Sequence, residues 1–238
     1  MVEFYCAAKS DVGCKRTLNE DSFIAREDIK LWAVADGAGG MDAGDVASRM
    51  VIERFRGLGS FLGGKSYLQD VEAAIRGAND DIRAYSDAHL GGRAMGSTVV
   101  CMISVRDFAA LLWVGDSRIY RVRGGMMEQV TRDHSLVQQL VDAGEISAAE
   151  AAIHPQKNVI TRAVGAAVGI DIDVTRFRIE PGDRFLLCSD GLTDAVPEGQ
   201  IAEMMRAADV DQGAERLLDA ALANGAKDNV TFLALEAR

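Results

Sequence analysis

Two short apolar runs in this chain end in the same pair of residues, Asp followed by Gly. Leu31–Gly37 reads LWAVADG and Phe185–Gly191 reads FLLCSDG. An apolar run of this length is typical of a buried strand, so Asp36 and Asp190 should lie where a strand leaves the core. A third acidic residue, Asp228, directly precedes another apolar stretch. If these strand ends meet, their carboxylates form a cluster of the kind that binds divalent cations.

An Asp-Gly pair is also a common two-residue hairpin turn, and a second strand would then have to follow at once. After Gly37 the chain instead continues into apolar residues at helical spacing over residues 46–58. After Gly191, Pro197 leads into another helical stretch. The lack of an immediate second strand weakens the hairpin interpretation at both places.

Further acidic residues stand at comparable positions. Asp116 follows the apolar part of LLWVGDSR, and Asp194 lies four residues after Asp190. Two carboxylates within about 4 Å repel by roughly 4 kcal/mol at an effective dielectric constant near 20, and a bound cation would remove this penalty. Oxygen ligands favour Mg²⁺ or Mn²⁺ over Zn²⁺, which usually recruits His or Cys. The 3 histidines are not spaced as ligands, so a zinc site is not expected.

The stretch RTLNED places the guanidinium of Arg16 shortly before two carboxylates, Glu20 and Asp21. A solvated loop with a weak ion pair is one interpretation, because exposed pairs contribute little to stability. Beside a site with two cations, however, an arginine can bind a phosphate through two parallel hydrogen bonds. Arginine, carboxylates and hard cations together indicate phosphoryl chemistry.

The composition fits one globular domain with a large core. The chain has 238 residues, of which 48% are hydrophobic, and this length suits a single domain. It contains neither an apolar run long enough to span a membrane nor an N-terminal signal peptide, so we expect a cytoplasmic protein without membrane contact. The net charge of −10 and the scattered basic residues argue against nucleic-acid binding.

The 4 cysteines suit a reducing compartment, because no two of them form a C-x-x-C pair. Cys101 and Cys188 lie inside apolar runs, where a buried thiol is expected. Although Cys188 is close to Asp190, nothing nearby would lower its pKa, so we interpret it as a core residue and not as a nucleophile.

Strand and helix patterns alternate in blocks. A first group of strands is followed by two helices, the second over about residues 69–89, and then by strands between residues 97 and 130 whose short turns imply antiparallel pairing. The pattern changes over residues 132–171, where Ser135 could cap one short helix and Ser147 with Glu150 could form the capping box of another. Two more strands, two helices and a last strand follow. We expect an α+β fold of two stacked sheets with helices outside.

The order of motifs along the chain resembles the bacterial branch of the metal-dependent PPM (PP2C-type) serine/threonine protein phosphatases. The motifs are RTLNED, DGAGG, GSTVV, WVGDSRIY, TRDHSLV, NVITRAVG, SDGLTD and KDNVT, and the resemblance extends from Asp11 to about Leu235. The resemblance implies a four-layer α-β-β-α sandwich, with two antiparallel β-sheets flanked by helix pairs. It also implies that residues 1–238 form a single catalytic domain, with a flap subdomain at about 132–171 that borders the active site.

The resemblance implies two Mn²⁺ or Mg²⁺ ions in the active site. Asp36 would bridge both ions, and the backbone carbonyl of Gly37 would complete the first site. Asp190 and Asp228 would bind the second ion, and Glu20 would act near it through water.

A third, weaker metal site is implied at Asp116, together with Asp190 or Asp194. Arg16 would bind the phosphate group of the substrate. Two further residues would orient the metal ligands or their waters without binding the ions themselves: Asp21 and Asn229. The implied reaction is hydrolysis of phosphoserine and phosphothreonine by a metal-bridging water, without a phosphoenzyme. We expect phosphorylated proteins as partners, among them a Ser/Thr kinase and its substrates, and a monomeric enzyme.

One position departs from many eukaryotic members of the family. Ala38 stands where those members have a histidine that is proposed to protonate the leaving group. The proton donor is therefore open between a water at the third metal site and one of two histidines, His134 or His154, although we interpret both histidines as structural.

Two other functions compete with phosphatase activity. A catalytically silent module of the same fold could bind phosphoproteins, but the presence of Asp36, Asp190, Asp228 and Arg16 argues against it. A two-metal nuclease conflicts with the acidic net charge and with the order of the motifs.

Overall fold

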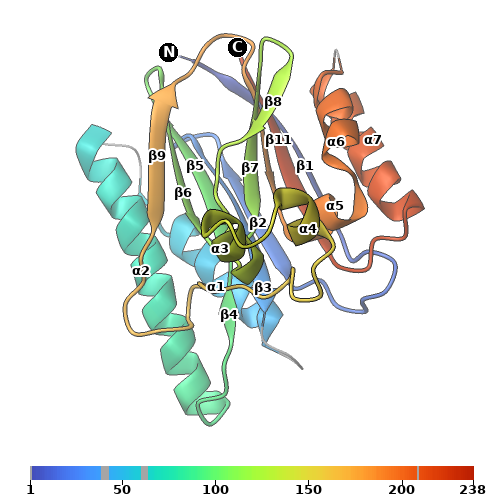
Figure 1. Cartoon of the computed structure of the whole chain (residues 1–238). Coiled ribbons are helices and arrows are strands. Elements are labelled where there is room, and N and C mark those ends of the chain that lie inside the picture. The colour runs from blue at the N-terminus through green and yellow to red at the C-terminus, as the bar shows by residue number, and fades with distance from the viewer. Residues whose placement is uncertain (1, 39–42, 60–63, 208) are drawn as a thin grey trace.

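The computed structural model describes residues 2–38, 43–59, 64–207 and 209–238. Two β-sheets lie face to face, and helices cover the outer face of each (Figure 1). All strand pairs recorded between the described residues are antiparallel. The predicted α+β fold with four layers is confirmed.

The first sheet has five strands in the order β1-β11-β10-β7-β8. Their bounds are β1 Phe4–Asp11, β11 Val230–Ala237, β10 Arg184–Cys188, β7 Arg118–Arg123 and β8 Met126–Gln129. The turn between β7 and β8 contains Gly124 and Gly125, both with positive φ, at 57° and 79°. The two strands are joined by a tight hairpin, since a type I′ turn requires positive φ at both central residues.

The second sheet has the strand order β2-β3-β5-β6-β9, and the short strand β4 pairs with the end of β3. Their bounds are β2 Asp21–Arg26, β3 Leu31–Ala38, β4 Gly96–Ser97, β5 Val99–Val105, β6 Phe108–Val114 and β9 Asp173–Arg178. The apolar stretch over residues 97–105 is thus divided between β4 and β5 at Thr98. The backbone N–H of Thr98 donates to the carbonyl oxygen of Asp36 over 2.8 Å, so the interruption lies at the candidate site.

Helices α1 (Gly44–Arg56) and α2 (Gly64–His89) cover the second sheet. The first sheet is covered by α5 (Asp190–Ala195), α6 (Glu198–Met205) and α7 (Val210–Ala223). Helix α2 begins earlier than the predicted residue 69. Helix α5 was not predicted, because six residues are too few to show a helical period.

Three apolar clusters account for the continuous apolar runs. In β3, Leu31, Ala33 and Ala35 pack against α1 and α2, whereas Trp32 and Val34 pack between the two sheets. A strand buried on both faces has no polar alternation. The side chain after Ala35, that of Asp36, therefore belongs to the face between the sheets.

Residues 132–171 lie outside both sheets. They contain α3 (Leu136–Asp142) and α4 (Ala148–Ala152). Ser135 caps α3 by accepting a hydrogen bond from the N–H of Gln138, and Ser147 with Glu150 forms a capping box at α4. Both capping predictions are confirmed. Among the described residues, no helix is both long enough and apolar enough to cross a membrane.

Candidate active site

The site is built from strand ends at one end of the sandwich. Asp21, the first residue of β2, is directly opposite Asp36 in the β2–β3 register. Residues opposite each other in antiparallel strands project to the same face of the sheet. Both carboxylates therefore point toward the first sheet, which supplies Asp190 at the end of β10 and Asp228 before β11.

Asp36 and Asp190 are in direct contact through their side chains. Burial and the nearby carboxylates of Asp21, Asp190, Asp116 and Asp228 raise the pKa of Asp36 well above its usual range. Burial, followed by the charges of Asp194 and Asp228, raises the pKa of Asp190 to about 6. The prediction that separate strand ends bring these carboxylates together is thus met by the tertiary structure.

Asp21 is held from the opposite sheet. The hydroxyl of Ser189 donates to its Oδ2 over 2.8 Å, and Thr231 also hydrogen-bonds its carboxylate. Burial is the largest cause of the rise in its pKa to about 7, which these two hydroxyl groups partly oppose. Asp21 is only 9% exposed, so its carboxylate lies in the interior, directly opposite Asp36 in the strand register. Sequence reasoning missed Ser189 and Thr231, although both lie inside the motifs SDGLTD and KDNVT.

Asp116 follows Gly115, which has a φ of 107°. Burial, and then the charges of Asp190 and Asp133, raise the pKa of Asp116 to about 7. The neighbouring Ser117 shares a hydrogen bond of 2.7 Å with Thr98, and the Thr98 hydroxyl accepts from the N–H of Asp36 over 3.1 Å. A buried hydroxyl pair thus joins the β6 end to the β3 end.

Arg16 lies at the mouth of the site. Its guanidinium donates to Oδ2 of Asp228 over 2.8 Å, and both side chains are partly exposed. The hydrogen bond to Asp228 raises the pKa of Arg16, with smaller contributions from the charges of Glu20 and Asp36. The predicted arginine is therefore beside the acidic cluster.

Asn229 fixes the loop that carries Arg16. Its Oδ1 accepts from the N–H of Glu20 over 2.8 Å, and its Nδ2 donates to the carbonyl oxygens of Val12 and Leu18, each over 2.9 Å. The side chain is 4% exposed. Asn229 supports the site by holding backbone groups of residues 12–20.

The glycines of the two Asp-Gly pairs are needed for close backbone packing and not for hairpins. A Cβ atom on Gly37 would overlap the carbonyl oxygen of Gly44, and one on Gly191 would overlap that of Asn229. The chain continues from Gly191 within α5, and α1 begins six residues after Ala38. The hairpin interpretation is wrong at both places.

Glu20 and Asp194 lie at the edge of the cluster. The Oε1 atom of Glu20 lies against the start of α1 at Gly44. Asp194 pairs with Lys157 of the 132–171 segment, whose Nζ is 2.6 Å from each carboxylate oxygen. A cavity of about 630 Å³ separates this segment from α5, and its lining includes Asp116, Asp190, Asp194 and Lys157.

The donor set fits hard divalent cations. Among the described residues, no three Asp, Glu, His or Cys side chains already surround a single point closely enough to hold an ion. Mg²⁺ commonly uses only one or two carboxylates and keeps several waters, so a complete cage of side chains is not required. Buried carboxylates with raised pKa values, compensated among the described residues only in part by Arg16, Lys157 and Arg118, are the arrangement that a metal ion would stabilise.

His134 is held by contacts at both ring nitrogens. Its Nδ1 accepts from the N–H of Gly115 over 3.0 Å, and its Nε2 lies 3.1 Å from Arg162 and 3.3 Å from Asp173. Its ring stacks on Trp113. These contacts anchor residues 132–171 behind Asp116.

Cys188 is fully buried, and burial raises the pKa of its thiol to about 12, as expected for a core residue.

A family model described as protein phosphatase 2C matches residues 15–226. The chain belongs to the protein phosphatase 2C family. Serine/threonine protein phosphatase PstP of Mycobacterium tuberculosis is 39% identical to this family member over 227 residues. The alignment covers 95% of this chain and 44% of PstP, so the chain spans less than half the length of that relative. Serine/threonine phosphatase stp of Listeria innocua is 34% identical, with 96% of this chain and 94% of the relative covered.

A solved structure of the catalytic domain of PstP, in complex with two manganese ions, has the same fold. It superposes with a TM-score of 0.91 at 36% identity and covers 100% of this chain and 99% of that domain. The two-sheet architecture of this chain is thus that of a protein phosphatase 2C catalytic domain.

Proposed function

We propose that this chain is a Mn²⁺- or Mg²⁺-dependent protein serine/threonine phosphatase that hydrolyses phosphoserine and phosphothreonine in bacterial signalling. One observation carries the proposal. The strand ends of two sheets bring Asp36, Asp190, Asp116 and Asp228 within electrostatic reach of one another, with Arg16 at the mouth. The family relationship and the manganese ions of PstP support the same assignment.

Each residue of the site has a proposed role. Asp36 would be a ligand of both metal ions, Gly37 would offer its carbonyl oxygen to the first, and Asp190 and Asp228 would hold the second. Glu20 acts near the second ion through water. When bound, the two ions supply a nucleophile at neutral pH and neutralise charge on the phosphoryl oxygens.

Three more residues complete the proposal. Asp116 forms a third metal site with Asp190 or Asp194, and for Asp194 this requires release from Lys157. Arg16 binds the substrate phosphate, for which its guanidinium must exchange Asp228 for the phosphoryl oxygens. Two residues support the others: Asp21 and Asn229.

The wider setting is also proposed. The enzyme acts as a monomer in the cytoplasm on phosphorylated proteins, including a kinase and the proteins that the kinase modifies. The four free cysteines, of which Cys14 is exposed, suit a reducing compartment.

The deciding experiment is phosphate release from a phosphothreonine peptide with and without Mn²⁺. We expect metal-dependent turnover by the wild type that nearly disappears in Asp36→Ala. No release by the wild type at millimolar Mn²⁺ would instead favour a silent phosphoprotein-binding module. In the same assay Arg16→Ala should mainly raise KM, because this residue holds the phosphate in ground and transition states alike. A large fall in kcat at unchanged KM would contradict the role given to Arg16.

A further inference from the structure

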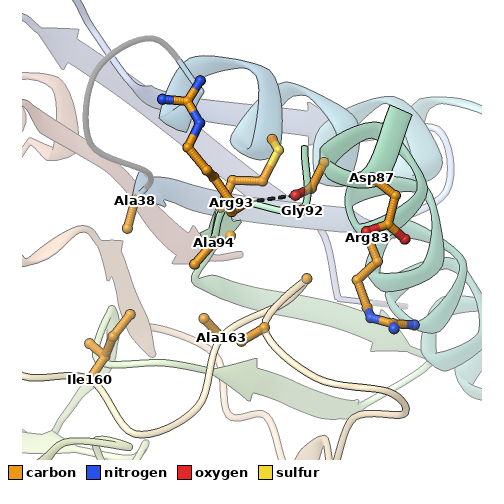
Figure 2. A pocket seen from close by; sticks show the side chains of 13 residues that line it. Ala38, Arg83, Asp87, Gly92, Arg93, Ala94, Ile160 and Ala163 are labelled. Carbon is orange, nitrogen blue, oxygen red and sulfur yellow. Dashed lines mark hydrogen bonds between the residues drawn. The ribbon is translucent and has the colours of Figure 1, made fainter. Parts of the chain in front are cut away.

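A second cavity, of about 500 Å³, lies beside the candidate metal centre. One wall is Ala38, the residue directly after Gly37, which is paired with Gly96 of β4. The opposite wall is formed by residues 160–166, and α2 with the following loop closes the remaining side (Figure 2). The cavity therefore shares a strand end with the proposed reaction centre.

The walls of this cavity are tied together by backbone hydrogen bonds. Ser97 and Val164 exchange two of them, over 2.9 and 2.8 Å. Ser86 of α2 donates to the carbonyl oxygen of Arg93 over 2.5 Å and so holds the loop after α2 in place. The buried side chains of Met95 and Ala163 form an apolar lining. The cavity is thus a built part of the fold and not a gap between loose loops.

Two arginines line the cavity, Arg83 from α2 and Arg93 from the loop, and their guanidinium groups extend toward opposite sides of it (Figure 2). Among the described residues, neither guanidinium has a carboxylate partner; the only side-chain hydrogen bond is from Nε of Arg93 to the carbonyl oxygen of Leu90, at 3.2 Å. Asp87 also lines the cavity without pairing with Arg83. By contrast, Arg118 and Arg123 are held by carboxylates of their own chain.

We propose that this cavity binds an acidic side chain of the protein substrate, close in sequence to the phosphorylated residue. Guanidinium groups without partners can bind a carboxylate through parallel, charge-assisted hydrogen bonds. The chain has a net charge of −10, so an acidic substrate would be repelled overall, and attraction requires a local positive group. The cavity is lined by two positive side chains, Arg83 and Arg93, and one negative side chain, Asp87, so its local charge is positive.

The position of the cavity limits where the acidic residue stands in the substrate. Consecutive Cα atoms such as those of Gly37 and Ala38 are about 3.8 Å apart, and an extended peptide advances about 3.3 Å per residue. Because Ala38 in the cavity wall is one Cα step from Gly37, the positions to examine are those close to the phosphorylated residue, about three on either side. This inference rests on the proposed phosphatase activity and adds a preference for part of the substrate.

The test compares phosphothreonine peptides that carry either Glu or Gln at one position from −3 to +3. We expect Glu at one or two of these positions to raise kcat/KM about fivefold through a lower KM, and the gain to shrink at high salt. In Arg83→Gln/Arg93→Gln the Glu-to-Gln ratio should fall to about one. The matched control is Arg216→Gln, which changes an exposed arginine on α7 and should keep the ratio.

The failure of this inference can be separated from a failure of the proposed activity. Thermal unfolding checks that each variant is folded, and binding of the same labelled peptides to the Mn²⁺-loaded protein is measured in parallel by fluorescence anisotropy. If no peptide is hydrolysed, the phosphatase proposal fails, while a Glu preference in binding that requires both arginines still supports the cavity. Two results would overturn the proposal that the cavity binds an acidic side chain. One is an equal affinity for Glu and Gln peptides at every position, and the other is a Glu preference that the double variant keeps.

Discussion

At the scale of single residues, the most informative feature is the electrostatic cost of the acidic cluster. Asp36 is surrounded by other carboxylates, and burial and their charges raise its pKa. A fold that gathers like charges in its interior is less stable than it would be with neutral groups there, unless cations bind. Such a cost is typical of a site kept for its chemistry.

A neutral replacement of Asp36 should therefore separate activity from stability. In the metal-free protein, Asp36→Asn should leave the free energy of unfolding unchanged or raise it by about 1 to 2 kcal/mol, because it removes one of the repelling charges. Urea denaturation in the presence of EDTA measures this. The exposed Asp219→Asn on α7 is the control and should change little. A loss of more than about 2 kcal/mol in Asp36→Asn would show that Asp36 has a mainly structural role.

Asn229 should have the opposite profile. Its carboxamide makes three hydrogen bonds to backbone groups of residues 12–20, and Asn229→Ala would leave those groups without partners. We expect a loss of about 2 to 4 kcal/mol in the free energy of unfolding and a higher KM, since the loop carries Arg16. Asn224→Ala removes a single bond to Ala195 and should cost less than about 1 kcal/mol. Equal effects of the two substitutions would argue against the role of Asn229 in holding residues 12–20.

At the scale of elements, the site depends on strand ends that meet at glycines. Gly191 lies within α5, and the carbonyl oxygen of Asn229 occupies the place that a Cβ atom would need. The β10 end can approach the start of β11 only because this side chain is absent. The same holds for Gly37 and Gly44 at the β3 end.

Two alanine substitutions in neighbouring helices test this packing. Gly191→Ala should lower the free energy of unfolding by about 3 kcal/mol, because the backbone must move to admit the methyl group. Gly199→Ala, in α6, meets open space and should raise it by a few tenths to about 1 kcal/mol, as expected for alanine in a helix. Denaturant unfolding of both variants gives the comparison. A neutral Gly191→Ala would mean that the two backbones are not in contact.

At the scale of the whole molecule, metal binding should couple the two sheets. Asp36 lies in β3 of one sheet, whereas Asp190 follows β10 and Asp228 precedes β11 of the other, so ions held by all three would link the sheets. Ligands that bind only the folded state stabilise it, by about 2.7 kcal/mol at one hundred times their Kd.

Mn²⁺ should therefore raise Tm by roughly 5 to 10 °C at saturating concentration. EDTA should reverse the shift, and Asp36→Asn should greatly reduce it. Differential scanning calorimetry with and without Mn²⁺ measures these values. An unchanged Tm at millimolar Mn²⁺, or an equal shift in Asp36→Asn, would contradict a metal site shared between the sheets.

The sequence by itself determined the elements and most of the candidate residues. Strands buried on both faces produce continuous apolar runs, and Ser135 and Ser147 mark helix starts through local hydrogen bonds, so both signals are readable without a structure. The motif order led to the family, which the match over residues 15–226 confirms. A six-residue helix such as α5 and the break at Thr98 leave no periodic signal, and neither was predicted.

Only the tertiary structure decided how the two Asp-Gly pairs are used. Whether Asp-Gly forms a hairpin or a close backbone contact depends on which distant segment lies beside it, here Gly44 and Asn229. The partners of the predicted residues were decided in the same way: Ser189 for Asp21, Asp228 for Arg16 and Lys157 for Asp194. These contacts join residues far apart in the chain, and a sequence pattern reports only neighbours within a turn or a strand. The cavity with Arg83 and Arg93 likewise exists only once α2, β4 and residues 160–166 are assembled.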